Sequence, residues 1–98
     1  MENTILHKET ETNGLFYIEK DGKIIAEMHY SFSEDDPTII VVKHTDVKPD
    51  LKGQGIGTKL LDALAEYARK KNLKVTPLCP FVEVQFNRNK KYNDIEAQ

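Results

Sequence analysis

The sequence predicts a single small α/β domain over residues 1–98, with a mixed β-sheet, one long helix after a glycine loop and a short C-terminal helix. The main observation is a β-branched run at residues 38–47, followed by three glycines at alternate positions and an amphipathic segment at 57–71. A further apolar run at 73–78 completes a strand–helix–strand order, which predicts that the two strands are parallel. With 98 residues, of which 39% are hydrophobic, the chain can form one modest core.

Two apolar runs near the N-terminus predict a β-hairpin. Residues 15–20 and 23–32 flank the pair Asp21-Gly22, and an Asp-Gly pair between two such runs is a strong hairpin signal. Residues 4–8 before this hairpin are interpreted as a weak first strand or a tail.

Residues 38–47 are predicted to form the central strand because this run is the richest in β-branched side chains. Residues 33–37 before it combine acidic residues with proline, which predicts a loop. Its acidic run at 34–36 is interpreted as solvated surface, and alternatively it could attract a cationic substrate.

The segment 57–71 is predicted to be an amphipathic helix. Glu66 and Lys70 stand four residues apart in the favourable order on its polar side, and Asn72 is suited to end it in a left-handed conformation. The apolar stripe at helical spacing consists of Leu60, Leu61, Leu64, Ala65 and Ala68.

The loop before this helix has the composition of a phosphate-binding loop. Its glycines are Gly53, Gly55 and Gly57, and the amides of residues 54–58 would lie at the first turn of the helix, where backbone N–H groups have no helical partner. Both the Walker motif and the dinucleotide-binding motif fail at Thr58, which stands where each requires glycine. An ordinary glycine-rich turn remains the alternative interpretation.

Cys79 precedes Pro80, and proline is favoured at the first position of a helix. Cys79 would then be the N-cap of a short C-terminal helix, where the helix dipole can activate a thiol. A buried and unreactive cysteine is the alternative, and on the residues alone it is the favoured one.

The three histidines stand singly in the sequence. His7 is expected to be a solvated terminal residue and His29 a surface residue of its strand, whereas His44 shares a face with Asp46 beside the glycine loop. Together with the single Cys79 they show no zinc-ligand spacing, so the sequence predicts no metal site.

The composition argues against several classes of partner. A net charge of −2 gives no reason to expect binding to nucleic acid or to an anionic membrane. No apolar run approaches the ~20 residues that cross a bilayer. A single cysteine rules out an internal disulfide and fits a reducing cytoplasm, and a small charged domain is expected to be a monomer.

Four short sequence motifs, here called phrases, occur in order along the chain, and together they resemble those of a known family. They are His-Thr-Asp-Val at 44–47, Leu-Lys-Gly-Gln-Gly-Ile-Gly at 51–57, Pro-Leu-Cys-Pro-Phe-Val at 77–82 and Tyr-Asn-Asp at 92–94. With them the chain resembles a minimal GNAT-superfamily N-acetyltransferase of the small YjdJ type. The glycine phrase is typical of the whole superfamily, and its combination with the Pro-Leu-Cys-Pro-Phe phrase is far more specific.

The resemblance implies that acetyl-CoA, or coenzyme A, binds where the strands ending at residues 47 and 78 splay apart. The pyrophosphate would lie on the amides of residues 54–58, and the pantetheine would pair with the backbone of residues 45–47. Lys52 stands where the family usually has Arg or Gln, which keeps the charge but loses the planar fork. The implied cofactor-binding residues are Thr45, Asp46, Val47, Lys52, Gly53, Gln54, Gly55, Ile56, Gly57 and Thr58.

The resemblance also implies transfer of an acetyl group to an amine acceptor, which the sequence does not identify. In direct transfer, His44 would take a proton from the amine with Asp46 tuning it, and Cys79 or Tyr92 would return a proton to the leaving thiolate. In a covalent route, Cys79 would accept the acetyl group first, with His44 as its base. Direct transfer is the usual route of the superfamily.

A non-catalytic module that binds acetyl-CoA or another protein is the alternative function. The first helices of a full-length GNAT domain, which normally shape the acceptor pocket, are not found here, and residues 39–42 read Ile-Ile-Val-Val where many relatives carry a glutamate base. These two features favour the module, whereas the presence of both Cys79 and His44 favours the enzyme.

Overall fold

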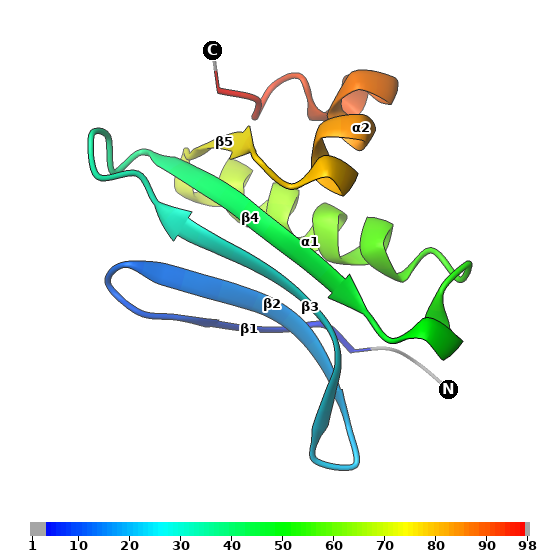
Figure 1. Cartoon of the computed structure of the whole chain (residues 1–98). Helices are drawn as coiled ribbons and strands as arrows, with labels where there is room; N and C mark the ends of the chain where they lie inside the picture. The colour runs from blue at the N-terminus through cyan, green and yellow to red at the C-terminus, as the bar shows by residue number, and fades with distance from the viewer. Residues whose placement is uncertain (1–3, 98) are drawn as a thin grey trace.

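The computed structural model describes residues 4–97, which form one mixed β-sheet with two α-helices (Figure 1). The strands lie in the order β1-β2-β3-β4-β5, and neighbouring strands are antiparallel except for the parallel pair β4 and β5. This confirms the predicted fold class. The elements are β1 (Leu6–Glu9), β2 (Asn13–Lys20), β3 (Lys23–Phe32), β4 (Ile39–Val47), η1 (Pro49–Leu51), α1 (Ile56–Lys71), β5 (Lys74–Pro77), α2 (Pro80–Arg88) and η2 (Lys90–Tyr92).

The turn between β2 and β3 follows from its two residues. Asp21 has a φ of 54° and Gly22 a φ of 79°, so both are left-handed, as a tight two-residue hairpin requires. The predicted hairpin is therefore confirmed.

Helix α1 packs against β2, β3 and β4 and lies behind β4 in the view of Figure 1. It begins one residue before its predicted start and ends at Asn72, whose φ of 58° is the predicted left-handed stop. Glu66 pairs with Arg69 at 2.9 Å rather than with Lys70. The buried residues of the helix are the predicted stripe together with Ile56.

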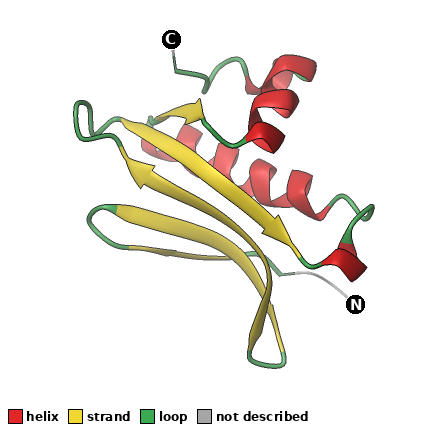
Figure 2. Cartoon of the chain, in the orientation of Figure 1, coloured by secondary structure: helices red, strands yellow, loops and turns green. Residues whose placement is uncertain are grey.

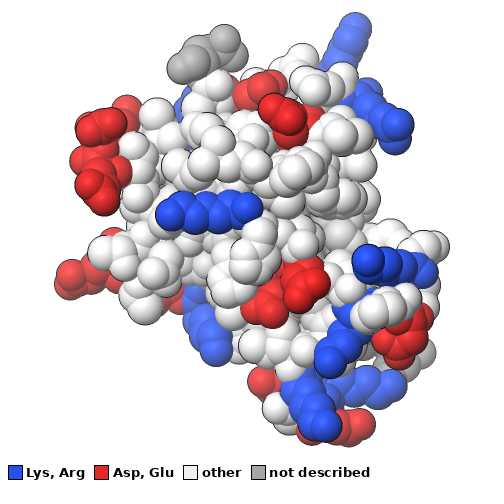
Figure 3. Space-filling model, in the orientation of Figure 1, with Lys and Arg blue, Asp and Glu red and all other residues white. Residues whose placement is uncertain are grey.

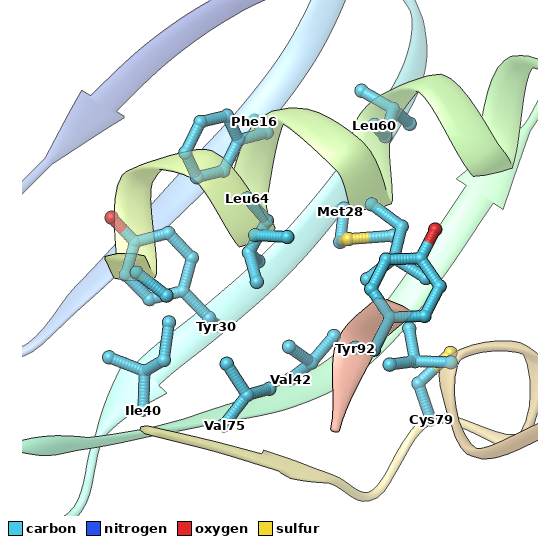
Figure 4. Packing of buried hydrophobic residues seen from close by; sticks show 14 of the residues in the cluster. Phe16, Met28, Tyr30, Ile40, Val42, Leu60, Leu64, Val75, Cys79 and Tyr92 are labelled. Carbon is cyan, nitrogen blue, oxygen red and sulfur yellow. The ribbon is translucent and has the colours of Figure 1, made fainter. Parts of the chain in front are cut away.

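The hydrophobic core lies between α1 and the sheet (Figure 4). Met28 of β3 and Leu60 and Leu64 of α1 are fully buried in it. Strand alternation in β3 and the 3.6-residue period of α1 turn these residues toward one another.

Helix α2 and the C-terminal segment close the core beside β5. The ring of Phe86 stacks on that of Tyr92, with 5.4 Å between the ring centroids. Beyond η2 the chain returns to the sheet, where the Val75 amide donates to the carbonyl of Ile95 at 2.6 Å. The outer edge of β5 is therefore covered by the end of the chain.

Strand β1 corrects one prediction. It spans Leu6–Glu9 rather than residues 4–8, and its register places His7 opposite Phe16. The two rings stack with 4.1 Å between their centroids, and His7 Nε2 lies 2.5 Å from the hydroxyl oxygen of Tyr30. His7 is exposed, as expected, although one side of its ring packs against aromatic side chains.

Strand β4 contains a bulge at Lys43. Val42 pairs with Tyr30 and His44 pairs with His29, which leaves Lys43 without a partner on β3. The extra residue shifts the alternation of side chains by one position. Val42 therefore faces α1, whereas His44 faces the side of the sheet opposite α1, here called the outer face.

Candidate active site

A cleft of about 320 Å³ opens between the end of β4 and the start of α1. Figure 2 shows the loop that joins these two elements around η1. The cleft is lined by Thr45, Asp46, Val47, Leu51, Lys52, Gly53, Gly55, Ile56, Gly57, Thr58 and Phe81. Of the predicted cofactor-binding residues, all except Gln54 therefore lie on it.

One wall of the cleft is the edge of β4 that β5 leaves unpaired. β5 pairs with β4 only as far as Val42, whose carbonyl accepts hydrogen bonds from the amides of Leu78 and Cys79 at 3.1 and 3.0 Å. The chain then turns into α2 and leaves the sheet. Within residues 4–97, residues 43–47 of β4 consequently have no strand beside them on this edge.

The opposite wall is the glycine loop, and its backbone has the geometry of an anion site. Gly53 has a φ of +85° and Gly55 a φ of +74°, a left-handed region in which a Cβ would be strained. The first helical hydrogen bond runs from the Lys59 amide to the Gly55 carbonyl at 3.0 Å. The amides of residues 54–58 have no hydrogen-bond partner among residues 4–97, so they are free to receive a phosphate.

Phe81 of α2 closes one side of the cleft against the helix start. A Cβ built on Gly57 would lie 2.8 Å from the Phe81 ring, which is closer than van der Waals contact allows. Gly57 thus leaves room for the Phe81 ring against the start of α1. Sequence reasoning placed Phe81 within the Pro-Leu-Cys-Pro-Phe phrase but gave it no role at the site.

Gln54 and Leu51 are the other two differences from the predicted lining. The side-chain amide of Gln54 donates to the Asp50 carbonyl at 3.4 Å instead of lining the cleft. Leu51 belongs to the turn η1, which begins at Pro49, and it lines the cleft. An apolar residue in a turn next to the glycine loop is the sequence feature that could have indicated this position.

Cys79 is the N-cap of α2, as predicted, and its side chain is buried. Its thiol donates to the Thr45 hydroxyl at 3.4 Å, and it makes no capping hydrogen bond to the helix. Thr45 lines the cleft whereas Cys79 does not. Cys79 therefore lies directly behind the cleft wall.

His44 lies on the outer face, away from Cys79. Thr45 pairs with the fully buried Met28 and so faces α1, and its neighbour His44 points to the other side of the sheet. Asp46 pairs with Glu27 and shares the outer face with His44, as predicted. The arrangement does not bring His44 to the Cys79 thiol.

Tyr92 lies in the core, 1% exposed, and does not line the cleft. Its hydroxyl donates to Asp62 at 2.6 Å. Burial, reinforced by this hydrogen bond to a carboxylate, raises the pKa of Tyr92 above its usual range. The three predicted catalytic residues, His44, Cys79 and Tyr92, thus lie in three different environments.

The acidic loop before β4 has a structural role at Asp36. Its carboxylate accepts hydrogen bonds from the amide and the hydroxyl of Thr38, at 2.9 and 2.6 Å. These bonds lower the pKa of Asp36 below its usual range. Nothing in this loop lines the cleft.

No helix within residues 4–97 is long and apolar enough to cross a membrane. Over the same residues, no three His, Cys, Asp or Glu side chains are grouped so that they could hold a metal ion.

Comparison with protein families matches residues 15–95 to the profile of GCN5-related N-acetyltransferases. Among solved structures, the chain is 36% identical to a GCN5-like candidate N-acetyltransferase from Staphylococcus aureus. The match covers 99% of this chain and 91% of that one, with a TM-score of 0.74. No curated protein sequence matched the chain.

Larger proteins share the fold over part of their length. A candidate GNAT-family acetyltransferase from Staphylococcus aureus is 25% identical over 68% of this chain and 56% of that one, with a TM-score of 0.59. The ribosomal-protein-S18-alanine N-acetyltransferase from Escherichia coli is 21% identical over 70% of this chain and 43% of its own, with a TM-score of 0.60, and at that identity it shows the fold alone.

Proposed function

The chain belongs to the GCN5-related N-acetyltransferase family, and on this premise we propose that it transfers the acetyl group of acetyl-CoA to an amine acceptor. One observation carries the proposal. Residues 45–47 on the unpaired edge of β4 and residues 55–58, whose amides have no partner, line the same cleft. A ligand with a pyrophosphate at one end and amide groups along its length would find amides for the pyrophosphate on one wall and an unpaired strand edge on the other.

The residues of the cleft fit coenzyme A. The amides of residues 54–58 would hold the pyrophosphate at the positive end of α1, and Lys52 would add one cationic charge. The backbone of residues 45–47 would pair with the pantetheine amides, with Phe81 packing alongside. Acetyl-CoA, when bound, would supply the acetyl group as a thioester.

The proton of the acceptor amine needs a base on this chain. In the reaction an N–C bond forms, the C–S bond of the thioester breaks, the nitrogen loses a proton and the released thiolate gains one. His44 is the candidate for the first proton, since its imidazole is exposed beside the open part of β4. Cys79 is the nearest candidate for the second, through the Thr45 hydroxyl at 3.4 Å.

Direct transfer is favoured over an acetyl-Cys79 route. A covalent route needs His44 within hydrogen-bond reach of the Cys79 thiol, yet the two side chains lie on opposite sides of β4. Direct transfer needs no contact between them.

A non-catalytic module that binds acetyl-CoA is the second candidate. It is favoured by the position of Tyr92, whose hydroxyl is held by Asp62 in the core and is not free to donate to a thiolate in the cleft. The two candidates share the cleft and differ in the roles of His44 and Cys79.

Titration with acetyl-CoA, followed by backbone amide NMR and by turnover with a panel of amines, tests both. We expect saturable shifts at residues 54–58 and 45–47 that are larger for coenzyme A than for ATP. Wild-type turnover above that of His44→Ala would support the enzyme, and equal rates with intact binding would support the module. If millimolar acetyl-CoA causes no shifts, both candidates are wrong.

A further inference from the structure

His29 and Glu27 of β3 stand beside His44 on the outer face, and sequence reasoning gave neither of them a role. The bulge at Lys43 brings this about, because it places His29 and His44 directly opposite each other across β3 and β4. Without the extra residue, the period of two would turn His44 to the same side as Val42, toward α1.

Glu27, His29 and His44 contact one another in that order. His29 Nε2 donates to Glu27 Oε1 at 2.7 Å, and a carboxylate acceptor fixes the hydrogen on that ring nitrogen. The rings of His29 and His44 lie with 4.5 Å between their centroids, tilted by 42°. Glu27 thus holds the ring of His29, and the ring of His29 packs against that of His44.

We propose that Glu27 and His29 are positioning residues for His44, holding its imidazole in the orientation that proton transfer requires. This proposal rests on the proposed function, in which His44 receives the proton of the acceptor amine. Neither residue touches the acceptor in this role. Each acts through the next side chain in the order Glu27, His29, His44.

His44 is exposed, so a contact from a neighbouring side chain is needed to hold its imidazole in one orientation. An imidazole on an open sheet surface can change rotamer freely, and a general base that changes rotamer loses most of its advantage. The His29 side chain is 40% exposed and that of Glu27 is 27% exposed. A half-exposed pair of this kind adds little to folding stability, so stability alone gives little reason for the contact.

Backbone pairing relates this group to the cleft. Asp46 pairs with Glu27 across the strands and lines the cleft, whereas Glu27, His29 and His44 do not line it. Figure 3, drawn from the outer side, shows acidic side chains over this part of β3 and β4.

A double-mutant cycle on kcat tests the proposal. We expect His29→Ala to lower kcat about tenfold and to leave KM for acetyl-CoA within about twofold, since loss of an orienting partner typically costs a factor of this order. In a His44→Ala background, His29→Ala should cause no further loss, because the residue acts only through His44. His29→Phe, which keeps a ring against His44, should retain more activity than His29→Ala.

A second measurement does not depend on turnover. In the wild-type protein we expect nuclear Overhauser contacts between the ring protons of His29 and His44, and a single rotamer for His44. His29→Ala should leave His44 averaging between rotamers, and Glu27→Gln should weaken the ring contact. Ser31→Ala, on the same strand and face as His29, is the matched control and should change neither kcat nor the His44 signals.

The outcomes separate this proposal from the proposed function. An active wild-type protein whose kcat is unchanged by His29→Ala, or whose losses at His29 and His44 are additive, would overturn the positioning role alone. A wild-type protein that binds coenzyme A but acetylates no amine would overturn the catalytic function, and the positioning role with it. A His44 ring that is already mobile in the wild-type protein would also overturn the positioning role.

Discussion

The thiol of Cys79 lies 3.4 Å from the hydroxyl of Thr45, which places a buried sulfur directly behind the wall of the cleft. The parallel pairing of β4 with β5 brings together these two residues, which are 34 positions apart in the chain. The environment of Cys79 is therefore that of a core residue, although its neighbour Thr45 lines the candidate active site.

Burial should make Cys79 slow to react. It is 4% exposed, so we expect thiol reagents to label the native protein at least about tenfold more slowly than the urea-unfolded protein. Labelling is followed by mass spectrometry, and the single cysteine makes the signal specific. Equal rates in the two states would mean that Cys79 is accessible in the native protein.

Gly55→Ala should weaken coenzyme A binding through the backbone. A side chain at its φ of +74° is strained, and we expect a loss of about 1 kcal/mol in the free energy of unfolding. Gly22→Ala is the matched control, because Gly22 has a φ of +79° in the distant hairpin and neither Cβ would meet a neighbour within 4 Å. Urea unfolding should show similar losses for both variants, and calorimetric titration should show weaker binding only for Gly55→Ala.

Gly57→Ala should displace Phe81. The new Cβ would lie 2.8 Å from the ring, and overpacking of this kind costs on the order of 1–3 kcal/mol in folding stability. Adding Phe81→Leu should recover part of this loss, because the smaller side chain makes room. Thermal unfolding of the two single variants and the double variant measures the coupling, and simple additivity would contradict the contact.

His7 should make the folding stability fall as the pH drops below about 6.5. Desolvation by the surrounding rings lowers the pKa of His7, although the Glu9 carboxylate acts in the opposite direction. With a lowered pKa in the folded state, the unfolded chain binds more protons. The stability contributed by neutral His7 is therefore fully present above its unfolded pKa and is lost as the pH falls.

Urea unfolding at about pH 7.5 and about pH 5.5 measures this effect. His7→Phe keeps an aromatic ring against Phe16 but does not titrate, so its stability should change less between the two pH values. A pH dependence as large as that of the wild-type protein would assign the effect to other groups. Glu9, whose pKa also lies below its usual value, titrates below this pH range.

Local patterns in the sequence were enough to predict most of the fold. The Asp21-Gly22 turn, the apolar stripe of α1 and the left-handed stop at Asn72 each depend on residues close together in the chain. The glycine loop is equally local, since the residues before α1 supply both its backbone conformation and its unpaired amides. The predicted residues of this loop, except Gln54, line the cleft for this reason, whereas residues 45–47 on the other wall were expected from the family resemblance.

What the sequence did not determine depends on contacts between distant segments. The bulge at Lys43 is a property of the pairing between β3 and β4, and only this pairing puts His44 beside His29. The stacking of His7 on Phe16 depends in the same way on the register of β1.

The position of Tyr92 also depends on contacts between distant segments. Its phrase is recognisable in the sequence, yet packing against Phe86 and the hydrogen bond to Asp62 decide that its hydroxyl lies in the core. Periodicity and turn chemistry determine which elements form, because they act over a few neighbouring residues. The side chains that meet are decided by register and packing, which exist only when the whole sheet and its helices have assembled.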